Sequence, residues 1–185
     1  MNMGTEQKMQ NWLTLLNDKL LPAVQHNAFW CDVLTQFDVQ EACRHSVHLA
    51  IFVEPYLQYV LDGSKTIESR FSTRRFAPYN QVGQGDIILL KKSSGPVVGI
   101  CQVMTAWFYQ LENKSWGEIK QNYSADLCAQ DPKFWQDRKG ASFATLIRIG
   151  HVLPVEPFAV DKRDRRGWVV LHAPSQQMEF QLEAV

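Results

Sequence analysis

A cation, an anion and a second cation stand close together in the segment "GSKTIESR", which runs from Gly63 to Arg70. In an extended strand alternate side chains share a face, so Thr66, Glu68 and Arg70 would be neighbours on one side. Lys65 lies at the entry to this strand, directly after the glycine turn. Because an unpaired buried charge is costly, each of these charged groups needs a partner if that face is enclosed.

Two interpretations of this segment are open. In the first, Glu68 and Arg70 form a supporting ion pair that fixes the strand to its neighbours. In the second, the charges form the polar floor of a cleft, where Lys65 and Arg70 hold an anionic or carbonyl-bearing ligand and Glu68 accepts from a base amine. A helix that begins at Pro55 would lend its N-terminal amides if the cleft lies at that end.

The composition bounds the class of protein. A chain of 185 residues fits one compact domain, or one domain with an appendage, and 45% hydrophobic with 21% charged residues is typical of a globular protein. The formal net charge is zero, so any attraction to phosphate must come from local patches. Apolar runs are too short to span a bilayer, and the first residues are too polar for a secretion signal. We therefore expect a cytoplasmic protein with no membrane partner.

Cysteine and histidine spacing does not predict a metal site. Cysteines stand at positions 31, 43, 101 and 128, without a C-x-x-C pair. Cys43, His45 and His48 are close in sequence but lack the second ligand pair that a zinc site needs. Dinucleotide, P-loop and metalloprotease motifs are missing from the sequence as well. We expect no metal and no cofactor, and we interpret His48 as a hydrogen-bonded core residue.

The first 45 residues are predicted to form a helical extension. In 5–21, apolar residues recur at three- and four-residue steps, which predicts one amphipathic helix, and Pro22 is predicted to end it. A weaker pattern over 28–43 predicts a second helix. An apolar stripe left exposed on 9–20 would indicate a protein partner for this extension.

From residue 46 the pattern changes to that of strands, and we predict a second unit over 46–185. Runs rich in β-branched and aromatic residues predict strands at 45–53, 65–71, 86–91, 97–108, 141–155 and 167–172, with an edge strand at 178–182. Gly63 lies where a short helix must reverse into a strand, so a positive φ is expected there. Strands with few helices between them predict an α+β fold, a small barrel that is closed or nearly closed and carries packed helices.

Two basic loops could extend a binding site. Arg74 and Arg75 follow the strand at 65–71, and a second cluster of charges lies at 162–166. If both loops rim one cleft they form a local phosphate track, and otherwise they are solvated loops. Tyr56 and Tyr79 are predicted to line the cleft, because a tyrosine beside the motif offers both a ring and a hydroxyl.

The motif resembles the signature of the ASCH family, which is related to the PUA fold. The matching residues are Pro55-Tyr56 and Val60-Leu61-Asp62-Gly63-Ser64-Lys65-Thr66-Ile67-Glu68-Ser69-Arg70, with weaker matches at Gly85-Asp86, Thr105-Ala106-Trp107 and Gly167-Trp168. The resemblance spans 47 to about 172 and implies a PUA-like β-barrel whose cleft binds RNA, a nucleotide or a modified nucleoside. The residues that we expect to bind this ligand are Tyr56, Lys65, Glu68, Arg70, Arg74, Arg75 and Tyr79.

The resemblance also implies an alternative function. Some small bacterial members are similar to amidohydrolases that remove acyl groups from acylated cytidine by means of a Lys, a Thr and a Glu. The Lys corresponds to Lys65, but the position of the Thr, three residues later, is Glu68, and Thr66 is not its equivalent. If the protein is an enzyme, Lys65 and Glu68 are the candidate catalytic residues, ahead of Thr66, with Glu68 activating a water. Whether it is an enzyme stays open at this point.

Overall fold

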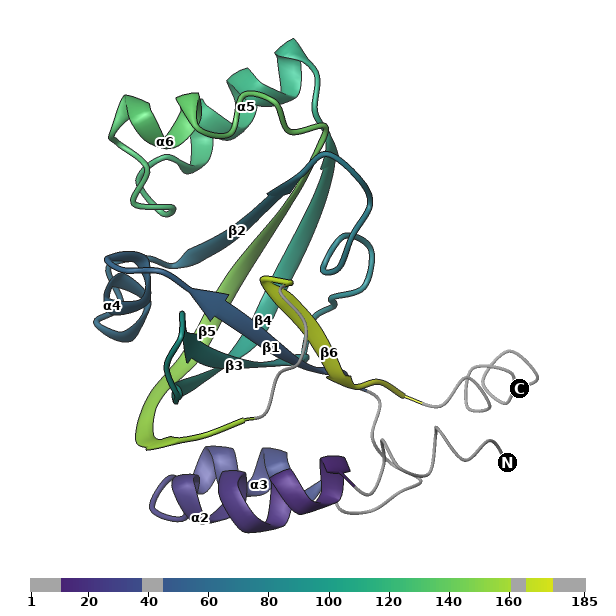
Figure 1. Ribbon diagram of the computed structural model, residues 1–185, viewed down its shortest axis with the longest axis vertical. Coiled ribbons are helices and arrows are strands. Elements are labelled where there is room, and N and C mark those ends of the chain that lie inside the picture. The colour runs from purple at the N-terminus through teal and green to yellow at the C-terminus, as the bar shows by residue number, and fades with distance from the viewer. Residues whose placement is uncertain (1–10, 38–44, 161–165, 175–185) are drawn as a thin grey trace, which may run out of the picture.

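The computed structural model describes residues 11–37, 45–160 and 166–174. In these residues a curled, six-stranded sheet forms a half-barrel with helices at both ends (Figure 1), which confirms the predicted α+β fold. The strand order is β2-β5-β4-β3-β1-β6, and β1 runs parallel to β3 while the other neighbours are antiparallel. The strands are β1 (Val47–Phe52), β2 (Ile67–Ser72), β3 (Ile87–Lys92), β4 (Val97–Gln110), β5 (Phe143–Phe158) and β6 (Trp168–His172).

These bounds agree with the predicted strands to within a few residues, and the predicted edge strand at 178–182 lies outside the described residues. The long pair β4 and β5 gives the sheet its curl. Their register shifts near Gly99, near Ile100 and near Val103, and such irregularities bend a strand and increase its twist. One long hairpin can therefore cross the whole half-barrel, pairing with β3 at one end and with β2 at the other.

The N-terminal helices pack against one face of the sheet. Residues 11–15 are helical and are followed by a π-helical turn (Leu16–Leu20), α2 (Leu21–Val24) and α3 (Ala28–Thr35). Trp12, Leu16 and Leu34 are buried in one core cluster with Leu49 of β1 and Leu89 of β3. The described part of the apolar stripe on the first helix is thus covered by the sheet. A protein partner for this extension stays a prediction, and the stripe does not support it.

The prediction that Pro22 ends the first helix was wrong. Helical structure continues through it to Val24. In an α-helix the proline ring clashes with the carbonyl four residues earlier. Here the Leu21 N–H donates to Leu16 O, five residues back, so the turn before Pro22 is widened and the chain accommodates the ring.

Three further helices complete the fold, α4 (Tyr56–Leu61), α5 (Asn113–Tyr123) and α6 (Pro132–Gln136). The helices α5 and α6 lie at the end of the sheet far from the N-terminal helices (Figure 1). There Ile119 and Phe134 form a third core cluster with Ile67 of β2 and Leu146 of β5. None of the helices in the described ranges is long and apolar enough to cross a membrane.

Gly63 tests whether backbone conformation at the turn before β2 matters. Its φ is +79°, as expected, and an added Cβ would meet nothing within 4 Å, so the cost of substitution comes from the backbone. We expect Gly63→Ala to lower the free energy of unfolding by about 1 kcal/mol. Gly117→Ala inside α5 is the matched control, because an added Cβ there also meets open space. We expect this control to raise the free energy of unfolding by about 0.5–1 kcal/mol. Urea unfolding measures both, and no loss in Gly63→Ala would contradict the argument.

Candidate ligand-binding cleft

In the part of the chain that the structure describes, β2 and β6 are the two edges of the sheet, and the half-barrel has an open seam between them. The side chain of Arg70 crosses this seam. Its Nη2 donates to Ile51 O of β1 at 3.0 Å, and its Nη1 donates to Gly167 O at 3.2 Å. The guanidinium lies over the rings of Phe52 and Trp168, 5.1 and 5.3 Å from their centroids. The Ile51 carbonyl is thus satisfied by a side chain, while Gly167 O also accepts from the Ile51 N–H at 3.0 Å.

A cleft of about 100 Å³ opens along this seam. Its walls come from the end of β1, the start of α4, the motif before and within β2, and α6 with the residues after it. The lining residues are Ile51, Phe52, Val53, Tyr56, Lys65, Glu68, Ser69, Arg70, Phe134 and Arg138. The structure therefore brings together four of the predicted ligand-binding residues, which are Tyr56, Lys65, Glu68 and Arg70.

Glu68 is the central charge of the cleft. Its side chain is nearly buried, and its two oxygens face two cations, with Oε1 at 2.9 Å from Arg70 Nε and Oε2 at 3.5 Å from Lys65 Nζ. Glu68 is therefore a buried carboxylate that lies between two cations. Such an arrangement fixes the carboxylate in position, since removing either cation would leave charge unpaired in a poorly solvated place.

The Lys65 amine is enclosed by protein acceptors. Its Nζ donates to Ile67 O at 2.6 Å and to Leu127 O at 3.2 Å, in addition to its ion pair with Glu68. An ammonium group has three donors, and two of them are used by these carbonyls. Burial lowers the pKa of Lys65 below its ordinary value, and the Glu68 carboxylate opposes part of this change.

A second wall of the cleft comes from residues that the sequence did not single out. Arg138 is half-buried, donates from Nη1 to Phe134 O at 2.7 Å, and lies over the Phe134 ring at 3.7 Å from the centroid. Phe134 in turn contacts the Tyr56 ring edge-on at 5.9 Å. Burial raises the pKa of the Tyr56 hydroxyl, and the nearby Arg138 charge opposes this. The signal available in the sequence was the four-residue spacing of Phe134 and Arg138, which places them on one face of a helical turn.

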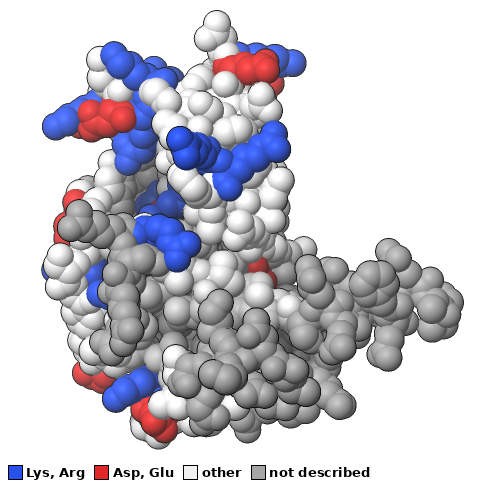
Figure 2. Space-filling view, turned by 45° about the vertical axis from the view of Figure 1, so that its right-hand side comes forward, with Lys and Arg blue, Asp and Glu red and all other residues white. Residues whose placement is uncertain are grey.

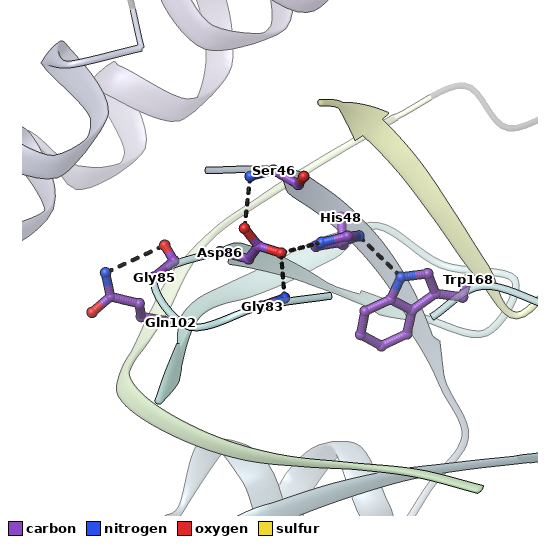
Figure 3. A network of polar contacts seen from close by, with 7 residues as sticks. All are labelled: Ser46, His48, Gly83, Gly85, Asp86, Gln102 and Trp168. Carbon is purple, nitrogen blue, oxygen red and sulfur yellow. Dashed lines mark hydrogen bonds and ion pairs between the residues drawn. The ribbon is translucent and has the colours of Figure 1, made fainter. Parts of the chain in front are cut away.

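A buried polar network supports the seam from behind (Figure 3). The Asp86 carboxylate accepts from the backbone N–H groups of Ser46 and Gly83 at 2.7 and 2.8 Å, and it lies 3.0 Å from His48 Nε2. On the other side of the ring, Trp168 Nε1 donates to His48 Nδ1 at 3.1 Å. An indole N–H can only donate, so Nδ1 must accept and the His48 proton lies on Nε2, directed at Asp86. His48 is thus a hydrogen-bonded core residue, as predicted.

The remaining candidate residues lie elsewhere. Thr66 donates from Oγ1 to Asp126 Oδ1 at 2.9 Å and is not among the described residues that line the cleft. Arg74 and Arg75 are exposed on the connection between β2 and β3, and Tyr79 packs against Phe108 and Phe143. Their ligand-binding roles stay predictions. Lys and Arg side chains gather around and within a recess on the face of the molecule that Figure 2 shows.

Two predictions depend partly on residues that are not described. The second charged loop lies outside the described residues up to position 165, and Arg166 is exposed. Cys43 of the rejected metal cluster is also outside them. Within the described ranges, no three His, Cys, Asp or Glu side chains come together in a way that could hold a metal ion.

Comparison with solved structures establishes the fold class. The chain is similar to the crystal structure of the ASCH protein from Zymomonas mobilis, with 12% identity and a TM-score of 0.56 over 76% of this chain and 95% of that one. A serine-to-alanine variant of that protein matches with 13% identity and a TM-score of 0.57, over 75% of this chain and 97% of that one. No family model and no curated protein matches the sequence. The protein therefore has an ASCH-like fold, as its motif indicated, and at this identity the likeness extends to the fold alone.

Burial of the Lys65 ammonium predicts a pH-dependent contribution to stability. Folding lowers the pKa of Lys65 from its ordinary value of 10.5, so between the folded pKa and 10.5 the unfolded chain binds more protons. In that window the contribution of Lys65 to the free energy of unfolding rises with pH. We expect the free energy of unfolding of wild type minus that of Lys65→Met to increase as the pH approaches 10.5. Urea unfolding at several alkaline pH values measures this difference, and a flat difference would contradict the assignment.

Proposed function

We propose that the protein binds RNA, a nucleotide or a modified nucleoside, and that one base enters the cleft at the seam. The observation that carries this proposal is the Glu68 carboxylate, which is held between two cations in a cleft with aromatic walls. A carboxylate accepts hydrogen bonds from the amino groups of nucleobases, and the rings of Tyr56, Phe52 and Phe134 offer apolar contact to a base.

The contacts of Lys65 and Arg70, the two inner cations of the cleft, indicate that they position Glu68. Lys65 donates to two backbone carbonyls and pairs with Glu68, and Arg70 likewise donates to two backbone carbonyls and pairs with Glu68. Both side chains are thereby suited to holding Glu68 and the seam in place before a ligand arrives. Such preorganisation lowers the entropic cost of binding, because these side chains are already ordered before the ligand arrives.

The size of the cleft restricts the ligand. Sites for drug-sized ligands span about 300–1,000 Å³, whereas this cleft has a volume of about 100 Å³. It suits one small group, such as a single base, better than a whole dinucleotide cofactor. A longer ligand would have to continue outside the cleft.

The charge of the lining favours a nucleotide over a nucleoside. Lys65, Arg70 and Arg138 contribute three formal positive charges and Glu68 one formal negative charge, which leaves a formal net charge of +2. The inner cations are occupied by Glu68 and carbonyls. Arg138, which is half-buried beside the cleft, is therefore the residue best suited to a phosphate oxygen.

We expect Arg138→Ala to separate phosphate recognition from base recognition. Isothermal titration would compare the four nucleoside monophosphates with the matching nucleosides. The wild type is expected to bind at least one monophosphate more tightly than its nucleoside, and Arg138→Ala to weaken that monophosphate by about tenfold, since a hydrogen bond to a charged group contributes about 1.5–3 kcal/mol. The control Lys139→Ala removes the same charge from an exposed neighbour outside the lining. Absence of any binding, or equal losses in both variants, would refute the proposal.

A second candidate function is hydrolysis of the acyl group of an N-acylated cytidine. One observation favours it: burial lowers the pKa of Lys65, and a neutral amine beside a carboxylate can exchange a proton. Two contacts weigh against it. Thr66, the hydroxyl of the motif, is tied to Asp126 away from the cleft lining, and Glu68 already faces two cations. Hydrolysis would therefore need a water nucleophile.

We expect the wild type to release no cytidine from N-acetylcytidine. Chromatography of the reaction products measures this release. A binding measurement on the same sample shows whether the compound occupies the cleft. Clear turnover by the wild type that disappears in Lys65→Met, with the folded state of the variant verified by circular dichroism, would reverse the order of the two candidates.

A further inference from the structure

The connection between β2 and β3 leaves an aromatic ring exposed although the connection itself is anchored. Ala77 and Val82 pack into the core cluster behind the seam. The Phe76 N–H donates to Arg74 O at 2.8 Å, and the Tyr79 N–H donates to Phe76 O at 2.9 Å, which fixes the turns. The Phe76 side chain is nonetheless 57% exposed. A single exposed apolar residue is ordinary, so its neighbours decide what it means.

Tyr79, three residues further along the connection, is aromatic and packs against two more rings. The Tyr79 ring meets Phe143 at 5.1 Å and Phe108 at 5.7 Å between centroids, both edge-on, and Phe108 is itself 36% exposed. The guanidinium of Arg75 lies over the Phe143 ring at 5.3 Å. We call the set the aromatic–arginine surface, and it comprises Arg74, Arg75, Phe76, Tyr79, Phe108 and Phe143.

This surface lies on the same face of the sheet as the cleft. Arg70 of β2 pairs with Thr145 of β5, which pairs with Phe108 of β4. Residues paired across antiparallel strands project from the same side of a sheet, so Arg70 and Phe108 share a face. Two strand spacings separate them, or about 10 Å. Thr145 lies between them on β5 and is buried, so a ligand would reach the aromatic–arginine surface by passing over the side chains that cover Thr145.

The local charge indicates the class of ligand. The segment 72–85 carries Arg74 and Arg75 and contains no Asp or Glu. Figure 2, which brings the right-hand side of Figure 1 forward, shows Lys and Arg side chains around a recess. Exposed rings beside exposed cations suit a chain that has flat apolar faces and a regular negative charge, which describes single-stranded nucleic acid.

We infer that the aromatic–arginine surface binds single-stranded nucleic acid, in which nucleotides adjacent to the base in the cleft stack on Phe76 and Phe108. The inference rests on the proposed function and narrows it, because it makes a strand of several nucleotides the ligand and a free nucleoside only a part of it. A duplex hides the faces of its bases and cannot use the exposed rings in this way.

Fluorescence anisotropy with labelled RNA and DNA strands of about eight nucleotides tests the inference. We expect Phe76→Ala to weaken binding of the preferred strand by about fivefold or more, because stacking on one ring contributes at least that factor. The double variant Arg74→Gln/Arg75→Gln should weaken binding and lower the salt slope by up to about 1.4, or about 0.7 for each lost phosphate contact.

Matched controls keep the comparison specific. Phe29→Ala, the control for Phe76→Ala, removes a different exposed phenylalanine, which lies on α3 and is 36% exposed. Lys114→Gln/Lys120→Gln removes two charges from α5, which packs against the opposite face of the sheet. Both controls should bind as the wild type does. The inference is overturned if the strand binds no more tightly than a mononucleotide, if duplex binds equally well, or if Phe76→Ala and the arginine double variant match their controls, as they would for a surface that takes a protein partner.

The same measurements separate this inference from the proposed function. Strand binding that depends on Phe76, Arg74 and Arg75 but not on Arg138 would uphold the surface and reject the cleft. Mononucleotide binding that depends on Arg138, without any gain from a longer strand, would uphold the cleft and overturn the surface.

Discussion

The open seam of the half-barrel is the constraint on which the rest of this structure depends. A sheet whose edges do not pair leaves backbone carbonyls unsatisfied, and burying them without partners would cost free energy. Arg70 supplies a partner, because its planar group donates to Ile51 O and Gly167 O while it forms an ion pair with the Glu68 carboxylate. A lysine in its place would be a point charge without this fork. The positive charge of Arg70 in the seam then requires an anion, and Glu68 supplies it. Lys65 pairs with the other oxygen of the same carboxylate.

The seam is held from both sides. On the cleft side lie Glu68 and Lys65, and on the core side the Trp168 ring lies against the Arg70 guanidinium. The orientation of Trp168 is set by its hydrogen bond to His48, whose own orientation is set by Asp86. Two polar clusters far apart in the sequence are thus joined through one indole ring. A change at Asp86 would therefore reach the cleft through Trp168 and Arg70 without any contact with a ligand.

Sequence patterns predicted most of the fold because strand periodicity, turn residues and the positive φ of Gly63 are local properties. The association of Lys65, Glu68 and Arg70 was also accessible, since strand alternation and the cost of buried charge follow from a few adjacent residues. The partners across the seam, Ile51 O and Gly167 O, depend on how far the sheet curls, which no local pattern reports. Arg138 reaches the cleft through the packing of α6, and the route of the helix through Pro22 depends on one widened turn. These are consequences of tertiary packing.

The two interpretations of the motif, a supporting ion pair and a polar floor, prove compatible in this geometry. A seam closed by backbone pairing would leave no room for a ligand, whereas a seam closed by side chains leaves space between them. Because Arg70 and Lys65 satisfy carbonyls, they hold Glu68 without needing a ligand to neutralise them. The cleft can then stand open in the folded chain with both cations held by protein groups. Structural support by the cations and the proposed recognition by the carboxylate therefore use the same arrangement of charges.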